Sequence, residues 1–226
     1  MLDKERHLLV LKQLLREVYS DNELSAQLVF KGGTALVLFY GLQRFSTDLD
    51  FDLRNTVEQI DLSRLSLLAE RYLTIRDSAS KTNTYLLEGS YESGMQQIKI
   101  EVNRRVYPQS FTLHNYLGMS IPILAREYLL AHKLCAITSR RSVQNRDIYD
   151  ADFMLKQNWQ ANPEIIQLRV GLAPTEYYAQ LLRLCDSAEV AGGVMVGLGE
   201  VLEPEQRAWA NANLIKSFRE QLLLRL

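Results

Sequence analysis

Cysteine is scarce in this chain, and the two that are present do not form a recognisable site. Cys135 and Cys185 are the only cysteines among 226 residues, and they lie far apart, outside any CxxC or Cys/His cluster. This spacing argues against a disulfide framework and against a structural zinc site. Both lie in apolar helical patterns, so we expect buried thiols.

Long apolar runs and an excess of charge of either sign are also missing. No apolar run reaches the roughly 18 residues that a membrane span needs, and the N-terminus mixes charges into its apolar residues. The 26 basic and 27 acidic residues leave a formal net charge of -1, which gives no overall attraction to nucleic acid or to a membrane. We therefore expect a soluble, cytoplasmic protein with no membrane partner, in which any polyanion contact comes from a local patch.

Covalent nucleophilic catalysis is disfavoured because the sequence shows no Ser/His/Asp or Cys/His arrangement. Only three histidines are present. We expect His7 and His114 at the surface, and His132, beside Lys133, as a packing or surface residue.

Hydrophobic periodicity divides the chain into two parts. Helical spacing predicts an opening helix over residues 3–19 and another over 56–72, and alternation predicts several strands within 73–107. Helical patterns then dominate at 122–140, 146–157, 163–171, 174–188 and 203–225, so we place a domain boundary near residue 115. The glycine-rich stretch 192–199 lacks a following Lys-Ser/Thr, which favours a loop over a P-loop.

A glycine turn precedes the first helix of the central region. The apolar segment ending at Phe30 runs into Lys31, Gly32 and Gly33, and a helical pattern starts at Thr34. Paired glycines let a backbone approach a phosphate closely, and a helix N-terminus offers free N–H groups and a positive dipole end. Taken alone, the turn is equally compatible with a plain loop.

Three aspartates alternate with apolar residues over residues 48–53. A strand would place Asp48, Asp50 and Asp52 on one face. Neighbouring carboxylates about 6.5–7 Å apart on that face repel by about 2–3 kcal/mol per pair, so a cation between them is expected. Mg²⁺ suits oxygen ligands and substrate phosphates. The alternative is a solvent-facing edge strand whose acids block edge pairing.

Further charged residues could complete such a site. The segment from Arg126 to Arg146 holds five basic residues against one acidic residue, an excess of four positive charges that could grip a triphosphate or RNA, or could line a solvated helix face. Lys133 lies among leucines, where a charge needs a partner. Glu101, on a predicted strand, could take a proton from an acceptor hydroxyl.

The order of these motifs resembles one enzyme superfamily. KGGTAL followed by RFSTDLDF resembles the nucleotidyltransferase signature, and more narrowly the AbiEii/AbiGii toxin family. That family continues with Lys-Leu-x-Ala, Arg and Arg-Asp-x-x-Asp, matched here by residues 133–136, Arg140-Arg141 and residues 146–150. Two features depart from the broad superfamily pattern: Lys31 replaces an apolar residue, and 14 residues separate Gly33 from Asp48.

The resemblance implies a role for each matching residue. Asp48 and Asp50 would bind metal, and Asp147 or Asp150 would complete the catalytic set together with Lys133 and the candidate base Glu101. The nucleotide phosphates would contact Lys31, Gly32, Gly33, Thr34, Ser46, Lys133 and Arg146.

Together, these patterns and the resemblance predict an α/β (α+β) protein. Residues 1–115 are expected to form a nucleotidyltransferase-like mixed sheet with helices, and residues 116–226 a helical C-terminal domain that closes the nucleotide cleft. The expected reaction moves a nucleoside monophosphate from an NTP to a hydroxyl acceptor, with two Mg²⁺ ions, or Mn²⁺ in their place. The resemblance implies an RNA acceptor such as a tRNA 3′ end, a toxin–antitoxin role and a cognate antitoxin. The alternatives are a small-molecule, antibiotic-type nucleotidyltransferase and a non-catalytic nucleotide-binding module.

Overall fold

The structure, a computed structural model, describes residues 3–54, 61–93, 96–187, 190 and 193–226. It divides into two compact units. The sheet unit contains Met1–Gly41 and Phe45–Leu124, and the helical unit contains Leu42–Arg44 and Ala125–Leu226. The three residues 42–44 therefore belong to the helical unit although they lie in sequence between two parts of the sheet unit.

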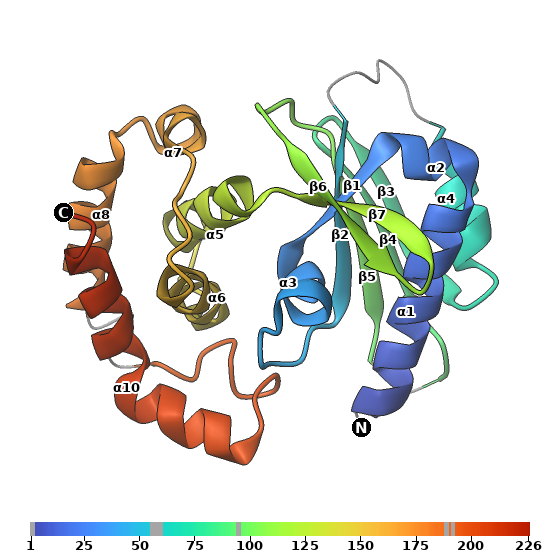
Figure 1. Cartoon of the computed structure of the whole chain (residues 1–226). Helices are drawn as coiled ribbons and strands as arrows, with labels where there is room; N and C mark the ends of the chain where they lie inside the picture. Colours follow the sequence, from blue (N-terminus) through green and yellow to red (C-terminus); the bar gives the residue numbers. More distant parts are fainter. Residues whose placement is uncertain (1–2, 55–60, 94–95, 188–189, 191–192) are drawn as a thin grey trace. The chain divides into compact units, whose positions relative to one another are not determined.

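The sheet unit is built on a seven-stranded mixed sheet with strand order β3-β4-β5-β2-β1-β7-β6. Its strands are β1 (Leu28–Lys31), β2 (Asp48–Leu53), β3 (Thr74–Lys81), β4 (Thr84–Ser90), β5 (Ile98–Asn103), β6 (Phe111–Tyr116) and β7 (Met119–Leu124). Its helices are α1 (Lys4–Ser20), α2 (Asn22–Gln27), α3 (Gly32–Tyr40) and α4 (Ser63–Ala69). In Figure 1, α1, α2 and α4 lie on one side of the sheet and α3 on the other.

Strand β2 occupies an interior position of this sheet. It pairs antiparallel with β1 and parallel with β5, whereas β1 pairs parallel with β7. The mixed sheet predicted from the sequence is therefore confirmed, and β2 is not the exposed edge strand of the alternative interpretation. Leu49 and Phe51 are fully buried, as the alternation requires.

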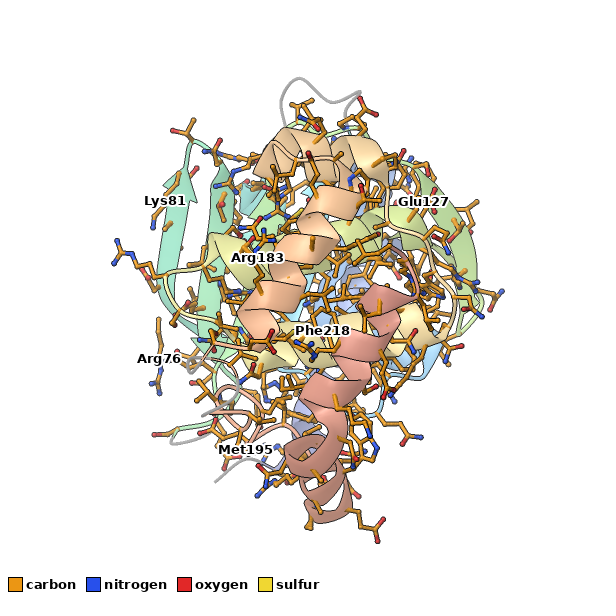
Figure 2. All side chains as sticks on the ribbon, turned by 90° about the vertical axis from the view of Figure 1, so that its left-hand side faces the viewer. Arg76, Lys81, Glu127, Arg183, Met195 and Phe218 are labelled. Carbon is orange, nitrogen blue, oxygen red and sulfur yellow. The ribbon has the colours of Figure 1, made fainter. Side chains whose placement is uncertain are left out.

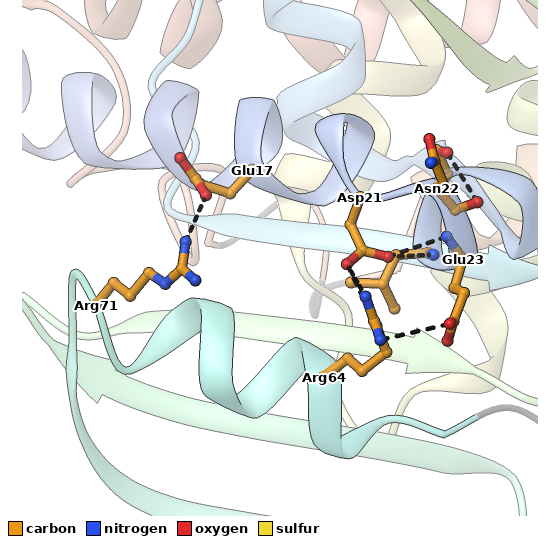
Figure 3. A network of polar contacts seen from close by, with 8 residues as sticks. Glu17, Asp21, Asn22, Glu23, Arg64 and Arg71 are labelled. Atoms are coloured by element: carbon orange, nitrogen blue, oxygen red, sulfur yellow. Dashed lines mark hydrogen bonds and ion pairs between the residues drawn. The ribbon is translucent and has the colours of Figure 1, made fainter.

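Helix α1 is capped by Asp3, whose side chain accepts a hydrogen bond from the backbone N–H of Arg6. Its next neighbour, α2, is capped in the same way by Asp21, which accepts from the N–H groups of Glu23 and Leu24. Figure 3 shows that the other oxygen of Asp21 binds Arg64 of α4, with Nη2 at 2.6 Å. This hydrogen bond from Arg64 is the main cause of the lowered pKa of Asp21. The cap thus also fastens α2 to α4.

The edge strand β3 is covered by polar and charged side chains. Arg76 and Lys81 are exposed and project away from the ribbon of this strand (Figure 2). Charged residues on an edge strand discourage pairing with another chain. The acidic strand β2, by contrast, has partners on both sides.

The helical unit contains α5 (Arg126–Ser139), α6 (Asn145–Lys156), α7 (Pro163–Val170), α8 (Pro174–Cys185) and α10 (Pro204–Leu223). Helix α6 packs against α5 and α10, and α8 packs against α7 and α10. Phe218 of α10, labelled in Figure 2, is buried in this packing. The core also includes Tyr177, whose hydroxyl donates to the carbonyl of Leu134 at 2.7 Å.

Several predicted boundaries differ from the observed ones. The units divide after Leu124, later than residue 115, because β6 and β7 form an antiparallel hairpin that pairs with β1. The helix predicted over 122–140 begins only at Arg126, since residues up to Leu124 are strand. Of the predicted helix 56–72, residues 56–60 lie outside the described part of the chain, as does Gly192 of the glycine-rich stretch.

Both cysteines are buried and free, as expected. Within the described ranges, no helix has the length and apolar character that crossing a membrane would require.

Phe51 tests the packing beneath the acidic face. Its ring is fully buried against Tyr19 of α1 and Phe30 of β1. We expect Phe51→Ala to lower the free energy of unfolding by about 3–5 kcal/mol, because it leaves a cavity under β2. Urea denaturation followed by circular dichroism measures this loss. A loss no larger than that of an exposed substitution such as Leu117→Ala would contradict the assigned packing.

Candidate active site

The acidic face of β2 is extended by the neighbouring strand β5. In the parallel register, Asp48 lies opposite Lys99, Asp50 opposite Glu101 and Asp52 opposite Asn103. Residues that are paired in this way point to the same face of a sheet. The structure therefore brings Glu101, the predicted candidate base, beside Asp50.

Asp52 has a different environment from the other two aspartates of β2. It is buried, with Lys31 Nζ at 2.5 Å and Asn103 Nδ2 at 2.7 Å from its Oδ1. Lys31, expected to bind nucleotide, thus neutralises a structural carboxylate in this structure. A buried charge needs such partners, so Asp52 anchors β1, β2 and β5.

Glu101 forms an ion pair on the same strand, with Lys99 Nζ at 2.8 Å. Burial would lower the pKa of Lys99, but the carboxylate of Glu101, with smaller contributions from Asp48 and Asp50, raises it. Strands β2 and β5 therefore bring four carboxylates to this face, and the ammonium groups of Lys31 and Lys99 pair with two of them.

The glycine turn lies directly against the carboxylate of Asp50. Gly32 has a φ of +82°, and a Cβ built on it would overlap Oδ2 of Asp50 and lie 2.8 Å from the Cβ of Asp50. Helix α3 starts here, and its N-cap residue Lys31 provides no side-chain cap. The N-terminus of α3, a position whose N–H groups suit an anion, therefore lies next to an acid.

Thr34 and Ser46, both expected to contact phosphate, are joined to each other. The hydroxyl of Thr34 lies 2.9 Å from Ser46 Oγ and 2.5 Å from the backbone carbonyl oxygen of Asp48. Thr34 is buried, whereas Ser46 is half-buried. In this structure, Thr34 holds the start of β2.

His7 is fully buried, so the expectation of a surface residue was wrong. Its Nε2 lies 3.1 Å from the carbonyl oxygen of Thr47, and its ring meets Phe45 and Tyr91 edge-on. Burial lowers its pKa, against opposing effects of the Thr47 carbonyl and the Asp48 charge. A signal was available: His7 falls one turn before Leu11, on the apolar stripe of α1.

The helical unit holds a second charged cluster, formed around Lys133. The ammonium group lies 3.1 Å from Asp147 Oδ1 and 2.9 Å from Asp150 Oδ2. Arg44 donates to both oxygens of Asp150, from Nε at 2.5 Å and Nη2 at 2.7 Å. Arg140 Nε lies 2.7 Å from Asp147 Oδ2. The partner that Lys133 was predicted to need is therefore a pair of carboxylates.

Electrostatics in this cluster favour the charged forms. Burial would lower the pKa of Lys133, but Asp150 and Asp147 raise it. Burial would raise the pKa of Asp150, but the charges of Arg44 and Lys133 lower it. Three cations face two carboxylates, which leaves one positive charge in excess. Such an excess can bind a phosphate.

The two aspartates of α6 are not equivalent. Both oxygens of Asp150 accept hydrogen bonds from Arg44. Asp147 is equally buried, and its Oδ2 lies 2.7 Å from Nε of Arg140, whose side chain is exposed. Asp150 is thus held by a buried arginine, and Asp147 by one that is open to solvent.

Two further arginines and the glycine-rich stretch also lie in the helical unit. Arg146 is half-buried and makes no ion pair within the described ranges. Arg44, by contrast, was missed, because nothing in its local sequence marks a loop arginine as the partner of a residue 106 positions away. The described part of the glycine-rich stretch forms turns that accept hydrogen bonds from Asn145, with Nδ2 2.7 Å from the carbonyl oxygen of Gly193.

Gly32 and Gly41 form a matched pair for testing the turn. Both have positive φ, but a Cβ on Gly41 would meet nothing within 4 Å. We expect Gly41→Ala to cost about 1–2 kcal/mol of backbone strain without affecting the site. Gly32→Ala should cost more stability and displace Asp50. Urea unfolding and nucleotide binding are measured on both variants. Equal losses of unfolding free energy and of nucleotide affinity in the two variants would contradict the contact with Asp50.

Asp150→Asn should lower the free energy of unfolding by about 3–5 kcal/mol, because it leaves Arg44 and Lys133 buried without their shared partner. The contribution is present above the unfolded-state pKa of about 3.9 and is lost as the pH falls through the lower folded-state pKa. The control Asp186→Asn breaks a surface pair with Arg219 and should cost about 1 kcal/mol or less. Urea denaturation at pH 7 compares the two; similar losses would refute the structural role of Asp150.

Comparison with known proteins identifies the fold and the family. The crystal structure of JHP933 from Helicobacter pylori is similar with a TM-score of 0.60 and 20% identity, covering 98% of this chain and 94% of that one. A Helicobacter pylori protein described as a candidate nucleotidyltransferase has a TM-score of 0.59 and 20% identity, covering 99% and 97%. No curated protein matches the chain.

At this identity the two structures show the fold alone, and they confirm the predicted nucleotidyltransferase-like architecture. The family profile described as "Nucleotidyl transferase AbiEii toxin, Type IV TA system" matches residues 13–192, which is most of the chain and includes both charged clusters. The predicted enzyme class is thereby confirmed. The chain belongs to the AbiEii family of nucleotidyltransferase toxins of type IV toxin–antitoxin systems.

Proposed function

We propose that this nucleotidyltransferase moves a nucleoside monophosphate from an NTP to an RNA hydroxyl, using divalent metal ions held by Asp48 and Asp50. The observation that supports this most directly is the contact between the glycine turn and Asp50. In this contact the N-terminus of α3, which would bind the anion, lies beside a carboxylate that would bind the cation. A metal-bound triphosphate needs both.

The residues on β2 fit Mg²⁺, or Mn²⁺ in its place. They offer carboxylate oxygens, and strands β2 and β5 bring four carboxylates to one face of the sheet. No group of three or more His, Cys, Asp or Glu side chains forms a complete metal site within the described ranges. Mg²⁺ is usually held by one or two carboxylates plus substrate phosphates, so the NTP would supply the remaining ligands. When bound, two such ions would neutralise phosphate charge and stabilise the leaving pyrophosphate.

The chain's own groups would handle the proton and the phosphates. Glu101, beside Asp50, would accept the proton of the acceptor hydroxyl. The acceptor oxygen then bonds to the α-phosphorus, and the bond from that phosphorus to the bridging oxygen breaks, so that pyrophosphate leaves with the electron pair. Backbone N–H groups at Gly32 and Gly33 would bind phosphate oxygens. In the helical unit, Lys133 would bind phosphate through the excess positive charge of its cluster, with Asp147 as the aspartate that acts at the site.

The acceptor is proposed to be RNA, with a tRNA 3′ end as the specific candidate. Arg140 and Arg141, at the end of α5, are exposed and basic, which suits a polyanion. Two of the five basic residues counted in this segment, Lys133 and Arg140, pair with Asp147, so the patch is weaker than the sequence alone indicated. Membership of a type IV toxin family implies an antitoxin partner. We place the protein in the cytoplasm, where RNA and NTPs are available.

Incubation with each labelled NTP, Mg²⁺ and total tRNA tests the proposal. Wild-type protein should label RNA, and Asp50→Asn should reduce the labelling to background, because it removes a metal-binding charge. The control Asp77→Asn makes the same change at an exposed position on β3 and should keep full labelling. Chelation by EDTA should also abolish the reaction.

Each part of the proposal can fail separately. Labelling that survives Asp50→Asn would refute the metal assignment. Labelling of an aminoglycoside but not of RNA would replace the acceptor by a small molecule. Nucleotide binding without labelling of either would point to a binding module.

A further inference from the structure

The backbone on both sides of Asp48 is held by side chains from other elements. The peptide group before Asp48 contains the carbonyl of Thr47, whose oxygen lies 3.1 Å from Nε2 of His7 in α1. The peptide group after Asp48 contains its own carbonyl, whose oxygen lies 2.5 Å from Oγ1 of Thr34 in α3. All four residues belong to the sheet unit.

Two fixed peptide planes determine the backbone of the residue between them. A residue has only two soft backbone dihedrals, and each is a rotation between its Cα and one flanking peptide plane. With both planes held, the direction of the bond from Cα to Cβ of Asp48 is set. This matters at Asp48, because β2 begins here and the preceding residues 45–47 form no regular secondary structure.

The environment of His7 suits this single task. A carbonyl oxygen only accepts, so Nε2 must carry the hydrogen, and Nδ1 is then the unprotonated nitrogen of a neutral ring. Within the described part of the chain, Nδ1 is buried and has no hydrogen-bond partner. The ring is otherwise enclosed by Phe45 and Tyr91. Its one polar contact is therefore directed at the peptide group that precedes Asp48.

We infer that His7 and Thr34 are positioning residues that aim the Asp48 carboxylate at its metal ion by fixing the two peptide groups that flank it. The inference rests on the proposed metal-binding role of Asp48. It assigns to α1, which carries none of the predicted site residues, a direct part in the geometry of the site. Groups that orient a metal ligand affect metal affinity by about 10–100-fold.

His7→Phe and His7→Gln test the inference. Phe keeps an aromatic ring but cannot donate, whereas the amide of Gln can still donate to the Thr47 carbonyl. Mn²⁺ binding without NTP, measured by electron paramagnetic resonance, should weaken about 10–100-fold in His7→Phe and recover in His7→Gln. The control Leu11→Ala opens a cavity one turn along α1 and should lower the melting temperature without changing Mn²⁺ affinity.

Amide hydrogen exchange of the peptide covering residues 45–50 gives a second readout that does not depend on metal. Exchange should be faster in His7→Phe than in Leu11→Ala, and close to wild type in His7→Gln. Equal exchange and equal Mn²⁺ affinity in His7→Phe and Leu11→Ala would overturn the inference. If wild-type protein binds Mn²⁺ neither alone nor together with NTP, the proposed metal function and the metal part of the inference fail, while the exchange data still decide whether His7 holds the backbone at Asp48.

Discussion

The sheet unit depends on how closely the turn after β1 approaches the carboxylate of Asp50. The antiparallel register places Lys31, the last residue of β1, directly opposite Asp50. The chain must therefore turn over that carboxylate as α3 begins, and only a residue without a Cβ fits at Gly32. This constraint brings a helix N-terminus and an acidic strand together from segments that are separated in sequence by a whole helix.

The two charged clusters follow the same physical logic. In each, one aspartate is neutralised by a basic partner and is needed for structure: Asp52 by Lys31, and Asp150 by Arg44. Around Lys133 three cations face two carboxylates, whereas on the sheet Asp48, Asp50 and Glu101 share one face with Asp52. The proposed phosphate suits the first cluster, and the proposed metal ion suits the second.

The sequence predicted elements better than it predicted partners. Alternation along β2 placed three acids on one face, but it could not distinguish Asp52, because Lys31 and Asn103 reach it only through strand pairing. Glu101 was correctly predicted to lie on a strand, because apolar and polar residues alternate along β5. The ion pair between Arg44 and Asp150 could not be predicted, since the two residues are distant in sequence and local patterns carry no information on such contacts. His7 was wrongly predicted to lie at the surface, because the prediction followed from its polar residue type and not from its position on the apolar stripe of α1.

The assignment of residues 42–44 to the helical unit has a consequence for dividing the protein. A cut after Leu124 follows the boundary between sheet and helices, yet it removes Arg44 from the half that contains Asp150. The C-terminal fragment would then enclose two carboxylates with one cation fewer, so its excess positive charge would disappear. The halves are therefore not independent modules: a short loop within the N-terminal half supplies a component that the C-terminal half needs to balance its interior.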